Sequence, residues 1–463
     1  MLPAPEICER ARLARDPRFD GRFITAVLTT GIYCRPVCPA RPPARENVRY
    51  FASAAAAQEA GYRPCLRCLP ETAPRVPEWT IGSKSVIQGL RLIDSGYLAD
   101  NDSTALAAEL GMCARHMGRL FRQELGASPK SLAQTRRLHL AKRLIDESDL
   151  GFSTIALQAG YGSVRRFNAE IKTVYGRSPR VLRGSSSSAG SATLVLHLPV
   201  RAPYNYRWVF EFLAKRALAG LEQVEGLEYR RRLAGGERWI SVRWQGDGLR
   251  LSVPGEASGM LSDILCRVRR VFDLDADPVA IDEHLREDEY LAPLVGRSPG
   301  LRVPGAWDGF ETAVRAILGQ QVSVARATKL ADLMIERYGD GDFPSPAALA
   351  DATPAEIGMP GNRGRAISNL ARAVRDGRIA LHDGVDPEVL TGSLTDLDGI
   401  GPWTAAYVGM RVAKDPDAFP DSDWVILKML GVKAAQARRR SLAWQPWRAY
   451  AVMYVWWAAG NND

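Results

Sequence analysis

The most informative stretch of the chain runs from Cys34-Arg-Pro-Val-Cys38 to Cys65-Leu-Arg-Cys68. It holds two close cysteine pairs separated by 26 residues, and this spacing is typical of one tetrahedral zinc site made of four thiolates. Two disulfides are the alternative, but no other feature of the chain indicates a secreted protein. The spacing leaves two roles open for the zinc. It could staple a small fold, or it could keep one thiolate deprotonated and nucleophilic.

The length of 463 residues exceeds what one hydrophobic core supports and predicts about three domains. Residues 1–18 mix charges and prolines without an apolar segment, so no signal peptide is expected. No apolar run approaches the ~18 residues of a transmembrane helix. Four of the seven cysteines lie in the cluster, which fits a reducing cytoplasm, and we expect Cys8, Cys113 and Cys266 to be packed or incidental thiols.

The net charge of +9 is unevenly distributed along the chain. Residues 1–80 carry 12 Arg and Lys against 8 Asp and Glu, and residues 81–184 carry 16 against 9. The remaining 279 residues carry 33 against 35. A basic front half and a near-neutral back half predict that nucleic acid is held by charge mainly at the front.

The cysteine stretch lies within a longer run of matching residues: Thr29-Thr-Gly-Ile-Tyr-Cys34, Pro39-Ala-Arg, Arg45-Glu-Asn-Val and Gly61-Tyr-Arg-Pro-Cys65. This order closely resembles the N-terminal domain of the Ada adaptive-response proteins and covers residues 1–76. The resemblance implies that Cys34 accepts a methyl group from a methylated phosphotriester in DNA, with Cys38, Cys65 and Cys68 as the other zinc ligands. The neighbouring Arg35, Arg45 and Arg67 are expected to contact DNA.

The charge of such a site connects repair to regulation. Four thiolates on a divalent zinc carry a net charge of about −2, which repels phosphate, and methylation of one thiolate leaves about −1. Irreversible repair would therefore raise the affinity of the chain for DNA.

Residues 77–183 are expected to be helical throughout. Ala105-Leu-Ala107, then Leu110-Gly111-Met112 and His116 to Phe121, follow the helix–turn–helix pattern, and the pattern recurs from Ile155 to Phe167. Both copies end alike, at Leu125-Gly-Ala-Ser-Pro and Tyr175-Gly-Arg-Ser-Pro, and an amphipathic helix around residues 133–146 joins them. Two such motifs resemble the AraC-type DNA-binding domain. Candidate groove-facing residues are Arg115, His116, Arg119, Ser163, Arg165, Arg166 and Asn168, which could contact bases or phosphates.

Residues 184–192 are predicted to be a flexible Ser/Gly linker. An Ada protein would continue with an alkylguanine methyltransferase carrying a Pro-Cys-His-Arg motif, and this chain has no such motif. Direct reversal of alkylated guanine is therefore not expected.

The back half is expected to contain a small α+β layer over residues 193–300 and an all-helical domain over residues 301–463. Period-2 strands are predicted at Leu194–Leu198, Arg238–Trp244 and Leu249–Val253, and one long helix with its exit at residues 307–323. Leu397-Asp-Gly399-Ile-Gly401-Pro is a Gly-x-Gly hairpin opening a helix, where bare backbone N–H groups can approach a phosphate.

The hairpin is followed by Phe419-Pro-Asp421-Ser-Asp423-Trp424 and by Pro446-Trp447-Arg448 leading to Trp456. In this order the motifs resemble the helix-hairpin-helix DNA glycosylases, most closely the AlkA type, over about 270 residues. The resemblance implies a base pocket of Trp403, Tyr407, Trp424 and Trp456, a catalytic carboxylate at Asp423, DNA contacts at Gly399 and Gly401, and a monovalent cation at the hairpin. Asp423 as a mere helix N-cap is the alternative.

Three further expectations follow from this resemblance. Trp447 is assigned to the core. Trp403 occupies the position of the Schiff-base lysine of lyase-competent relatives, so base excision without strand cleavage is expected. Gln321 stands where relatives insert a leucine wedge, which leaves its role as the wedge open.

The predicted fold is multidomain and α-rich with α+β parts. It comprises a small zinc-binding α/β module, an all-helical AraC-type double helix-turn-helix, a small α+β layer and an all-helical helix-hairpin-helix glycosylase domain. We expect double-stranded DNA as the partner, RNA polymerase during activation, no membrane, and a nucleoid-associated cytoplasmic location. Two alternatives remain: a glycosylase whose front half only tethers it to DNA through a structural zinc module, and a transcription regulator whose glycosylase half is inactive.

Overall fold

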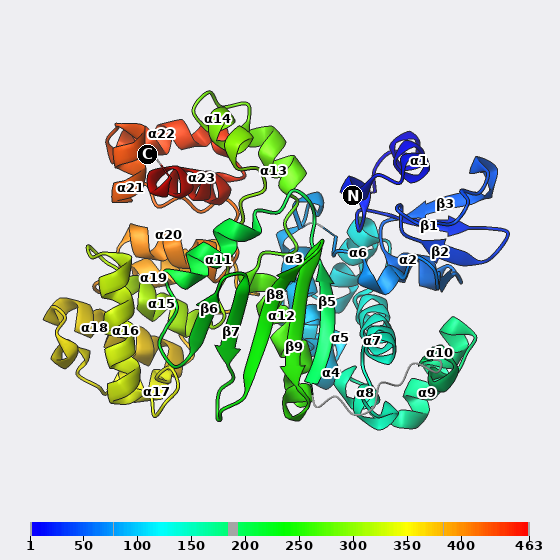
Figure 1. The fold of residues 1–463 in the computed structure, drawn as a ribbon, viewed down its shortest axis with the longest axis horizontal. Helices are drawn as coiled ribbons and strands as arrows, with labels where there is room; N and C mark the ends of the chain where they lie inside the picture. The colour runs from blue at the N-terminus through cyan, green and yellow to red at the C-terminus, as the bar shows by residue number, and fades with distance from the viewer. Residues whose placement is uncertain (1, 77, 184–192, 383, 462–463) are drawn as a thin grey trace. The chain divides into compact units, whose positions relative to one another are not determined.

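The computed structural model describes residues 2–76, 78–183, 193–382 and 384–461 (Figure 1). The chain forms two compact units. The first comprises Met1–Arg201, Gln245–Cys266 and Leu274–Ala276, and the second comprises Ala202–Trp244, Arg267–Asp273 and Asp277–Asp463. The predicted linker over residues 184–192 lies outside the described residues. None of the described helices has the length and apolar character that crossing a membrane requires.

The first unit begins with a small α/β module whose sheet has the strand order β3-β1-β2-β4. Strand β1 is antiparallel to β2 and β3, while β4 is parallel to β2, with Tyr33 opposite Pro64. Because β2 ends at Cys34 and β4 ends one residue before Cys65, the parallel pairing brings one cysteine of each pair to the same end of the sheet. The elements are α1 (Pro5–Ala14), β1 (Ile24–Val27), β2 (Ile32–Cys34), β3 (Val48–Phe51), α2 (Ala54–Glu59) and β4 (Arg63–Pro64).

The helices that follow confirm two helix–turn–helix motifs, α5–α6 and α8–α9, joined by α7. Gly111 and Gly160 lie in the turns at φ +67° and +79°, a backbone conformation that a side chain disfavours. Ser128 caps the start of α7, which is longer than the predicted span. The helices are α3 (Lys84–Asp94), α4 (Tyr97–Asp100), α5 (Ser103–Glu109), α6 (Ala114–Leu125), α7 (Pro129–Glu147), α8 (Phe152–Gln158), α9 (Val164–Tyr175) and α10 (Pro179–Arg183).

The cysteine module packs against the helical part of the same unit. The Ser53 hydroxyl donates to the Leu125 carbonyl (2.7 Å), and the buried Tyr33 hydroxyl lies 3.0 Å from Nε2 of His139 on α7. Tyr33, the residue preceding Cys34, is thus in direct contact with α7, the helix that joins the two helix–turn–helix motifs. In the same unit, β5 (Thr193–Pro199) pairs antiparallel with β9 (Gly248–Pro254).

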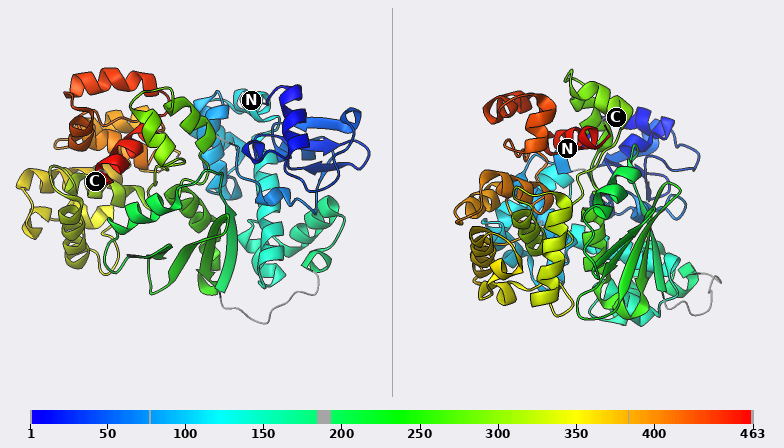
Figure 2. Two further views of the ribbon diagram at one scale, coloured as in Figure 1. Left: turned by 45° about the horizontal axis from the view of Figure 1, so that its top comes forward. Right: turned by 60° about the vertical axis from the view of Figure 1, so that its left-hand side comes forward.

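The second unit contains an antiparallel run of strands and a larger set of helices. Strands β6 (Glu222–Glu225), β7 (Glu228–Arg232) and β8 (Trp239–Gln245) pair in sequence order and appear as twisted green strands in Figure 2. The helices are α11 (Tyr206–Ala214), α12 (Leu261–Val271, entering from the first unit), α13 (Pro278–Leu285), α14 (Leu291–Arg297), α15 (Gly309–Leu318), α16 (Val324–Tyr338), α17 (Pro346–Ala350), α18 (Gly361–Arg375), α19 (Pro387–Thr395), α20 (Pro402–Arg411), α21 (Trp424–Leu430), α22 (Ala434–Arg440) and α23 (Arg448–Gly460).

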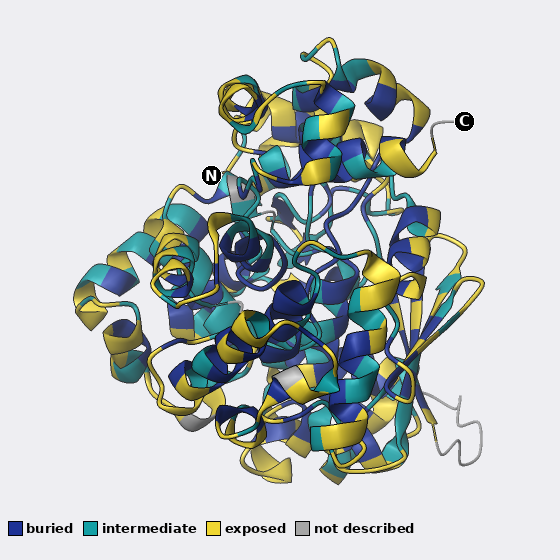
Figure 3. Ribbon diagram, turned by 90° about the vertical axis from the view of Figure 1, so that its left-hand side faces the viewer, coloured by how far each residue is buried: buried dark blue, intermediate teal, exposed yellow. Residues whose placement is uncertain are grey.

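Helix α15 is the central helix of this set. Nine of its ten residues are buried, and it packs against α16, α18 and α20. In Figure 3 buried residues, in dark blue, line the sides of the helices that face one another. The helix and exit predicted over residues 307–323 correspond to α15, which ends at Leu318, and the residues up to Ser323, the N-cap of the next helix. Residues 319–323 are therefore a loop.

A buried ion network ties α15 to the strands of the second unit. Glu311 accepts from Nη2 of Arg231 (2.6 Å) and from Arg315 (2.9 Å), and Glu222 accepts from Arg315 (3.2 Å). Burial alone would raise the pKa of Glu311, but the two guanidiniums outweigh it and hold the pKa at about 2. The network is complete only when both carboxylates are ionised.

Glu311→Ala should lower the free energy of unfolding of the second unit by about 3–5 kcal/mol, because it leaves Arg231 buried without its closest carboxylate. Urea denaturation followed by tryptophan fluorescence measures the loss. The matched control is Glu356→Ala, whose exposed pair with Arg337 (3.4 Å) contributes less than about 1 kcal/mol. Equal losses in the two variants would contradict this account.

The contribution of Glu311 to the free energy of unfolding should also depend on pH. Since the folded pKa of Glu311 is lowered, this contribution should be present above pH ~4.3 and lost as the pH falls towards 2.

Candidate functional site

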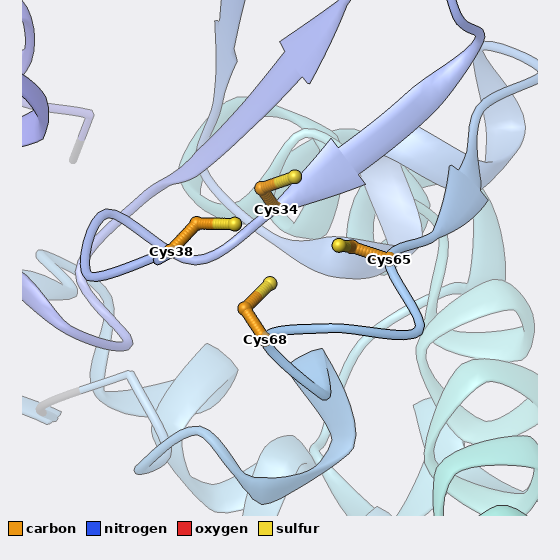
Figure 4. A group of neighbouring side chains, drawn as sticks. All are labelled: Cys34, Cys38, Cys65 and Cys68. Carbon is orange, nitrogen blue, oxygen red and sulfur yellow. The ribbon is translucent and has the colours of Figure 1, made fainter. Parts of the chain in front are cut away.

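The four predicted cysteine ligands converge in the first unit. Figure 4 shows their side chains pointing towards one another, and their Sγ atoms all lie within 4.8 Å of each other. All seven cysteines of the chain are free thiols, so the two-disulfide alternative is not realised. Zinc held by four thiolates at ~2.3 Å keeps the sulfurs about 3.8 Å apart. The donor set and its spacing fit one zinc ion.

The four sulfurs are not equivalent. Cys65 and Cys68 are buried, and each accepts a backbone N–H at 3.4 Å, from Arg67 and Arg35 respectively. Cys34 and Cys38 are partly exposed. The two pairs therefore differ in how far their residues are exposed.

The three arginines predicted to contact DNA near this site have different environments. Arg35 is turned inward: its guanidinium pairs with Asp20 and donates to the Thr72 hydroxyl (2.7 Å) and the Cys68 carbonyl (3.2 Å). Its side chain is only 17% exposed. Arg45 and Arg67 are exposed. Arg35 thus braces the cysteine loops, whereas Arg45, whose guanidinium lies 3.8 Å from the Glu6 carboxylate, and Arg67 are at the surface.

The predicted groove-facing residues lie on the exposed faces of α6 and α9. Arg115 and Arg119 are exposed, and Arg119 lies 2.9 Å from Nδ1 of His116. Arg165, Arg166 and Asn168 are exposed in the second motif, where Ser163 is the N-cap of α9. Both sets lie at the start of the second helix of their motif, and this helix is the part of the motif that enters a major groove.

The second unit contains a cavity of about 1440 Å³ that Asp423, Trp403, Tyr407 and Trp456 line together. Asp423 Oδ2 accepts from the Trp403 indole N–H (2.9 Å), and Oδ1 accepts from the Trp456 indole N–H (3.1 Å). Oδ1 also accepts from the Ile426 backbone N–H (3.0 Å), so Asp423 is the N-cap of α21. Three donors fix the orientation of this carboxylate. Asp423 therefore both caps α21 and lines the cavity.

The rings of the cavity form a continuous aromatic surface. Trp403 and Tyr407 are stacked, with centroids 5.5 Å apart and planes 16° apart, and Trp456 is tilted against Tyr407 at 6.2 Å. The Tyr407 hydroxyl accepts from Arg411 (2.7 Å). Burial would raise the pKa of Tyr407, but Arg411 and two further guanidiniums lower it below its ordinary value.

Trp424 lies apart from these stacked rings. It borders the cavity but is 70% exposed, and Lys428 Nζ lies 4.9 Å from its ring centroid. It is the first residue of α21, directly after Asp423. Trp447 is buried, as expected for a core residue.

The Gly-x-Gly hairpin connects α19 to α20. Gly399 has φ +87°, and a Cβ there would lie 2.7 Å from Cβ of Ala366, so both conformation and space require glycine. Gly401 is the N-cap of α20, which opens with a proline. The amide of Gln320 donates to the Gly399 carbonyl and to the Thr404 hydroxyl, both at 3.0 Å. These bonds fix the loop after α15 to the hairpin.

Gln321 lies in the middle of that loop. It is exposed, borders the cavity and has φ +54°, a left-handed conformation that is uncommon outside glycine. Neither Gln320 nor Arg411 was identified from the sequence. An isolated glutamine or a helical arginine carries no local signal, because Gln320 and Arg411 bond to partners 79 and 106 residues away, Gly399 and Gly305, that only the fold brings near.

Comparison with known families matches three parts of the chain. Residues 7–71 match the metal binding domain of Ada, residues 106–185 match a helix-turn-helix domain, and residues 195–308 match the AlkA N-terminal domain. Together with the four-cysteine site and the aromatic cavity, these matches define a class of protein: an Ada-type zinc and helix-turn-helix regulator fused to an AlkA-type DNA repair enzyme.

The relatives agree with this class along the whole chain. The chain is 40% identical to the probable bifunctional transcriptional activator/DNA repair enzyme AlkA of Mycobacterium tuberculosis, over 97% of this chain and 96% of that protein. It belongs to this family of bifunctional AlkA proteins. It is also 35% identical to DNA-3-methyladenine glycosylase 2 of Escherichia coli (56% of this chain, 95% of that protein) and 36% identical to the E. coli activator and repair enzyme Ada (37% and 47%).

Cys68→Ala should abolish the binding of one zinc per chain, because three remaining thiolates leave the tetrahedral set incomplete. Metal content after extensive dialysis measures this. Cys113→Ala is the control, since Cys113 is exposed and outside the cluster. Retention of one zinc per chain in the Cys68 variant would contradict a four-cysteine site.

Proposed function

We propose that the second unit hydrolyses the N-glycosidic bond of alkylated bases such as 3-methyladenine. We also propose that the first unit transfers a methyl group from a DNA methylphosphotriester to Cys34 and then activates transcription of repair genes. The observation that carries the first proposal is the convergence of a buried carboxylate, Asp423, with two indole N–H groups and a ring stack in one cavity. The names of the relatives support both proposals.

The cavity supplies what excision of a base requires. A damaged base must leave the duplex stack and enter a pocket, and a cationic alkylpurine is attracted to the faces of aromatic rings such as those of Trp403 and Tyr407. Asp423 would stabilise the positive charge that develops on the sugar and orient the attacking water. No lysine stands at position 403, so the reaction ends with the abasic site and an uncut strand.

Asp423→Asn should slow the release of methylated purines by on the order of a hundredfold or more, because a neutral amide no longer stabilises the sugar cation. Single-turnover release from methylated duplex DNA measures the rate, and fluorescence anisotropy checks that DNA binding persists. Asp421→Asn is the matched control: its carboxylate accepts from Nε of Arg438 (2.6 Å) and does not line the cavity. Unchanged release by the Asp423 variant would refute the assignment.

The proposed methyl transfer needs an accessible, ionised sulfur. When zinc is bound, it would keep the four cysteine sulfurs deprotonated at neutral pH. The sulfur of Cys34, a partly exposed residue, would attack the methyl carbon, so that a C–S bond forms, the C–O bond breaks and the phosphate leaves with the electron pair. Exposed Arg45 and Arg67 would hold the neighbouring phosphates. The chain then carries one negative charge fewer.

Methylation of Cys34 should tighten binding to a promoter fragment about fivefold, because a unit charge ~4 Å from a phosphate contributes ~1 kcal/mol in water. Anisotropy titration of methylated and unmethylated protein at matched salt measures the change. Cys34→Ser, which cannot be methylated by the same route, is the control. Equal affinities would remove the regulatory switch.

The wider partners follow from the same proposal. The helices α6 and α9 would enter the grooves of promoter DNA, and RNA polymerase would be recruited once the site is methylated. The hairpin at Gly399 to Gly401 would bind a phosphate, with a monovalent cation at its carbonyls. The protein would act at the nucleoid. The two alternatives, a structural zinc module and an inactive cavity, each predict the loss of one of the two reactions.

A further inference from the structure

The loop between α15 and α16 contains a strained residue. Gln321 has φ +54°, and a residue with a side chain persists in this left-handed region only where its surroundings hold it there. Gln321 is also exposed and borders the cavity. Strain of this kind occurs mainly at functional positions, so the contacts that maintain it are of interest.

The residue before it, Gln320, is bonded to three neighbouring elements. Its backbone N–H donates to the Ile317 carbonyl in the last turn of α15 (3.2 Å), and its side-chain amide donates to the Gly399 carbonyl and the Thr404 hydroxyl (3.0 Å each). Its own carbonyl accepts from Nη2 of Arg363 (2.5 Å). That carbonyl belongs to the peptide group between residues 320 and 321. Holding it therefore restricts the φ angle of Gln321 directly.

The far side of the loop is anchored as well. The Ser323 hydroxyl accepts from the Arg326 backbone N–H (3.2 Å) and caps α16. Only Gln321 and Val322 lie between the two anchors. The strained residue thus projects from a short segment whose two ends are fixed.

Arg363 supplies its bond from the first turn of α18. The residue is half-buried, and within the described residues no carboxylate pairs with its guanidinium. A bond from a charged donor is about twice as strong as one between neutral groups. Helix α18 also packs against the hairpin, where Cβ of Ala366 fills the space beside Gly399. One helix therefore supports both the hairpin and the loop.

We propose that Arg363 is a positioning residue for extrusion of the damaged base: by holding the Gln320 carbonyl, it keeps Gln321 in the conformation that inserts into the duplex. A nucleotide that leaves the stack leaves a gap, and a side chain that fills the gap lowers the cost of keeping the base out. A glutamine on a mobile loop would lose conformational entropy at each insertion, whereas a clamped backbone has already lost it. This inference rests on the proposed glycosylase function and concerns extrusion, not hydrolysis.

The test begins with Arg363→Met in the full-length chain, which removes the donor and keeps most of the length. Single-turnover release of 3-methyladenine from a fully paired duplex should fall about tenfold, as expected for the loss of one charge-assisted bond. Arg363→Lys, which retains a charged donor, should recover most of the rate. Arg372→Met is the control on the same helix, since Arg372 is exposed and donates to the Asn369 side chain (3.1 Å).

Two further measurements separate positioning from a general loss of structure. The defect of Arg363→Met should shrink when the 3-methyladenine lies opposite a mismatched base, because such a base costs less to extrude. In a Gln321→Ala background, Arg363→Met should have little additional effect, because both changes remove the same action. Affinity for undamaged duplex and its dependence on salt should stay unchanged.

An unchanged rate on the paired duplex, or an equal loss on paired and mismatched duplexes, would overturn the proposal. Additive losses in the Gln321→Ala background, or weaker binding with a shallower salt dependence, would make Arg363 a phosphate contact and overturn it too. If the unaltered chain released 3-methyladenine from neither duplex, the glycosylase function itself would be refuted instead.

Discussion

The carboxylate of Asp423 is the point at which three helices of the second unit meet. It caps α21 through the Ile426 N–H and accepts the indole N–H groups of Trp403 on α20 and Trp456 on α23. A carboxylate that is 8% exposed and holds three donors cannot turn without leaving donors unsatisfied. The aromatic surface of the cavity therefore depends on the same group that is proposed to act on the sugar, and packing and chemistry cannot be varied independently.

The first unit rests on a comparable constraint. Parallel pairing of β2 with β4 brings distant cysteine pairs together, and Arg35 holds the loops between them by bonding to Asp20, Thr72 and the Cys68 carbonyl. The contact of Tyr33 with His139 continues from this site to α7, the helix between the two DNA-binding motifs. Since these contacts lie within one compact unit, a change at Cys34 has a short physical route to the helices proposed to bind promoter DNA.

Local sequence patterns predicted several structural features of this molecule, because each pattern determines the conformation of a few neighbouring residues. Close cysteine pairs, the glycines of the helix–turn–helix turns and the Gly399 hairpin each impose a conformation on a few residues, and the structure has all three. Predictions were weaker where partners are distant. The ion pair of Arg35 with Asp20, and the 70% exposure of Trp424 at the edge of the cavity that it was predicted to line, carry no local signal in the sequence.

The central claim is that one chain carries out two reactions on methylated DNA, methyl transfer to Cys34 and hydrolytic release of methylated purines. The most direct measurement incubates the purified full-length protein with duplex DNA methylated at phosphates and bases by a radiolabelled agent, and then locates the label. The account predicts label fixed on Cys34, found by peptide mapping, together with free methylated purines in solution. Free purines without labelled protein would contradict the methyl-acceptor half, and labelled protein without free purines would contradict the glycosylase half.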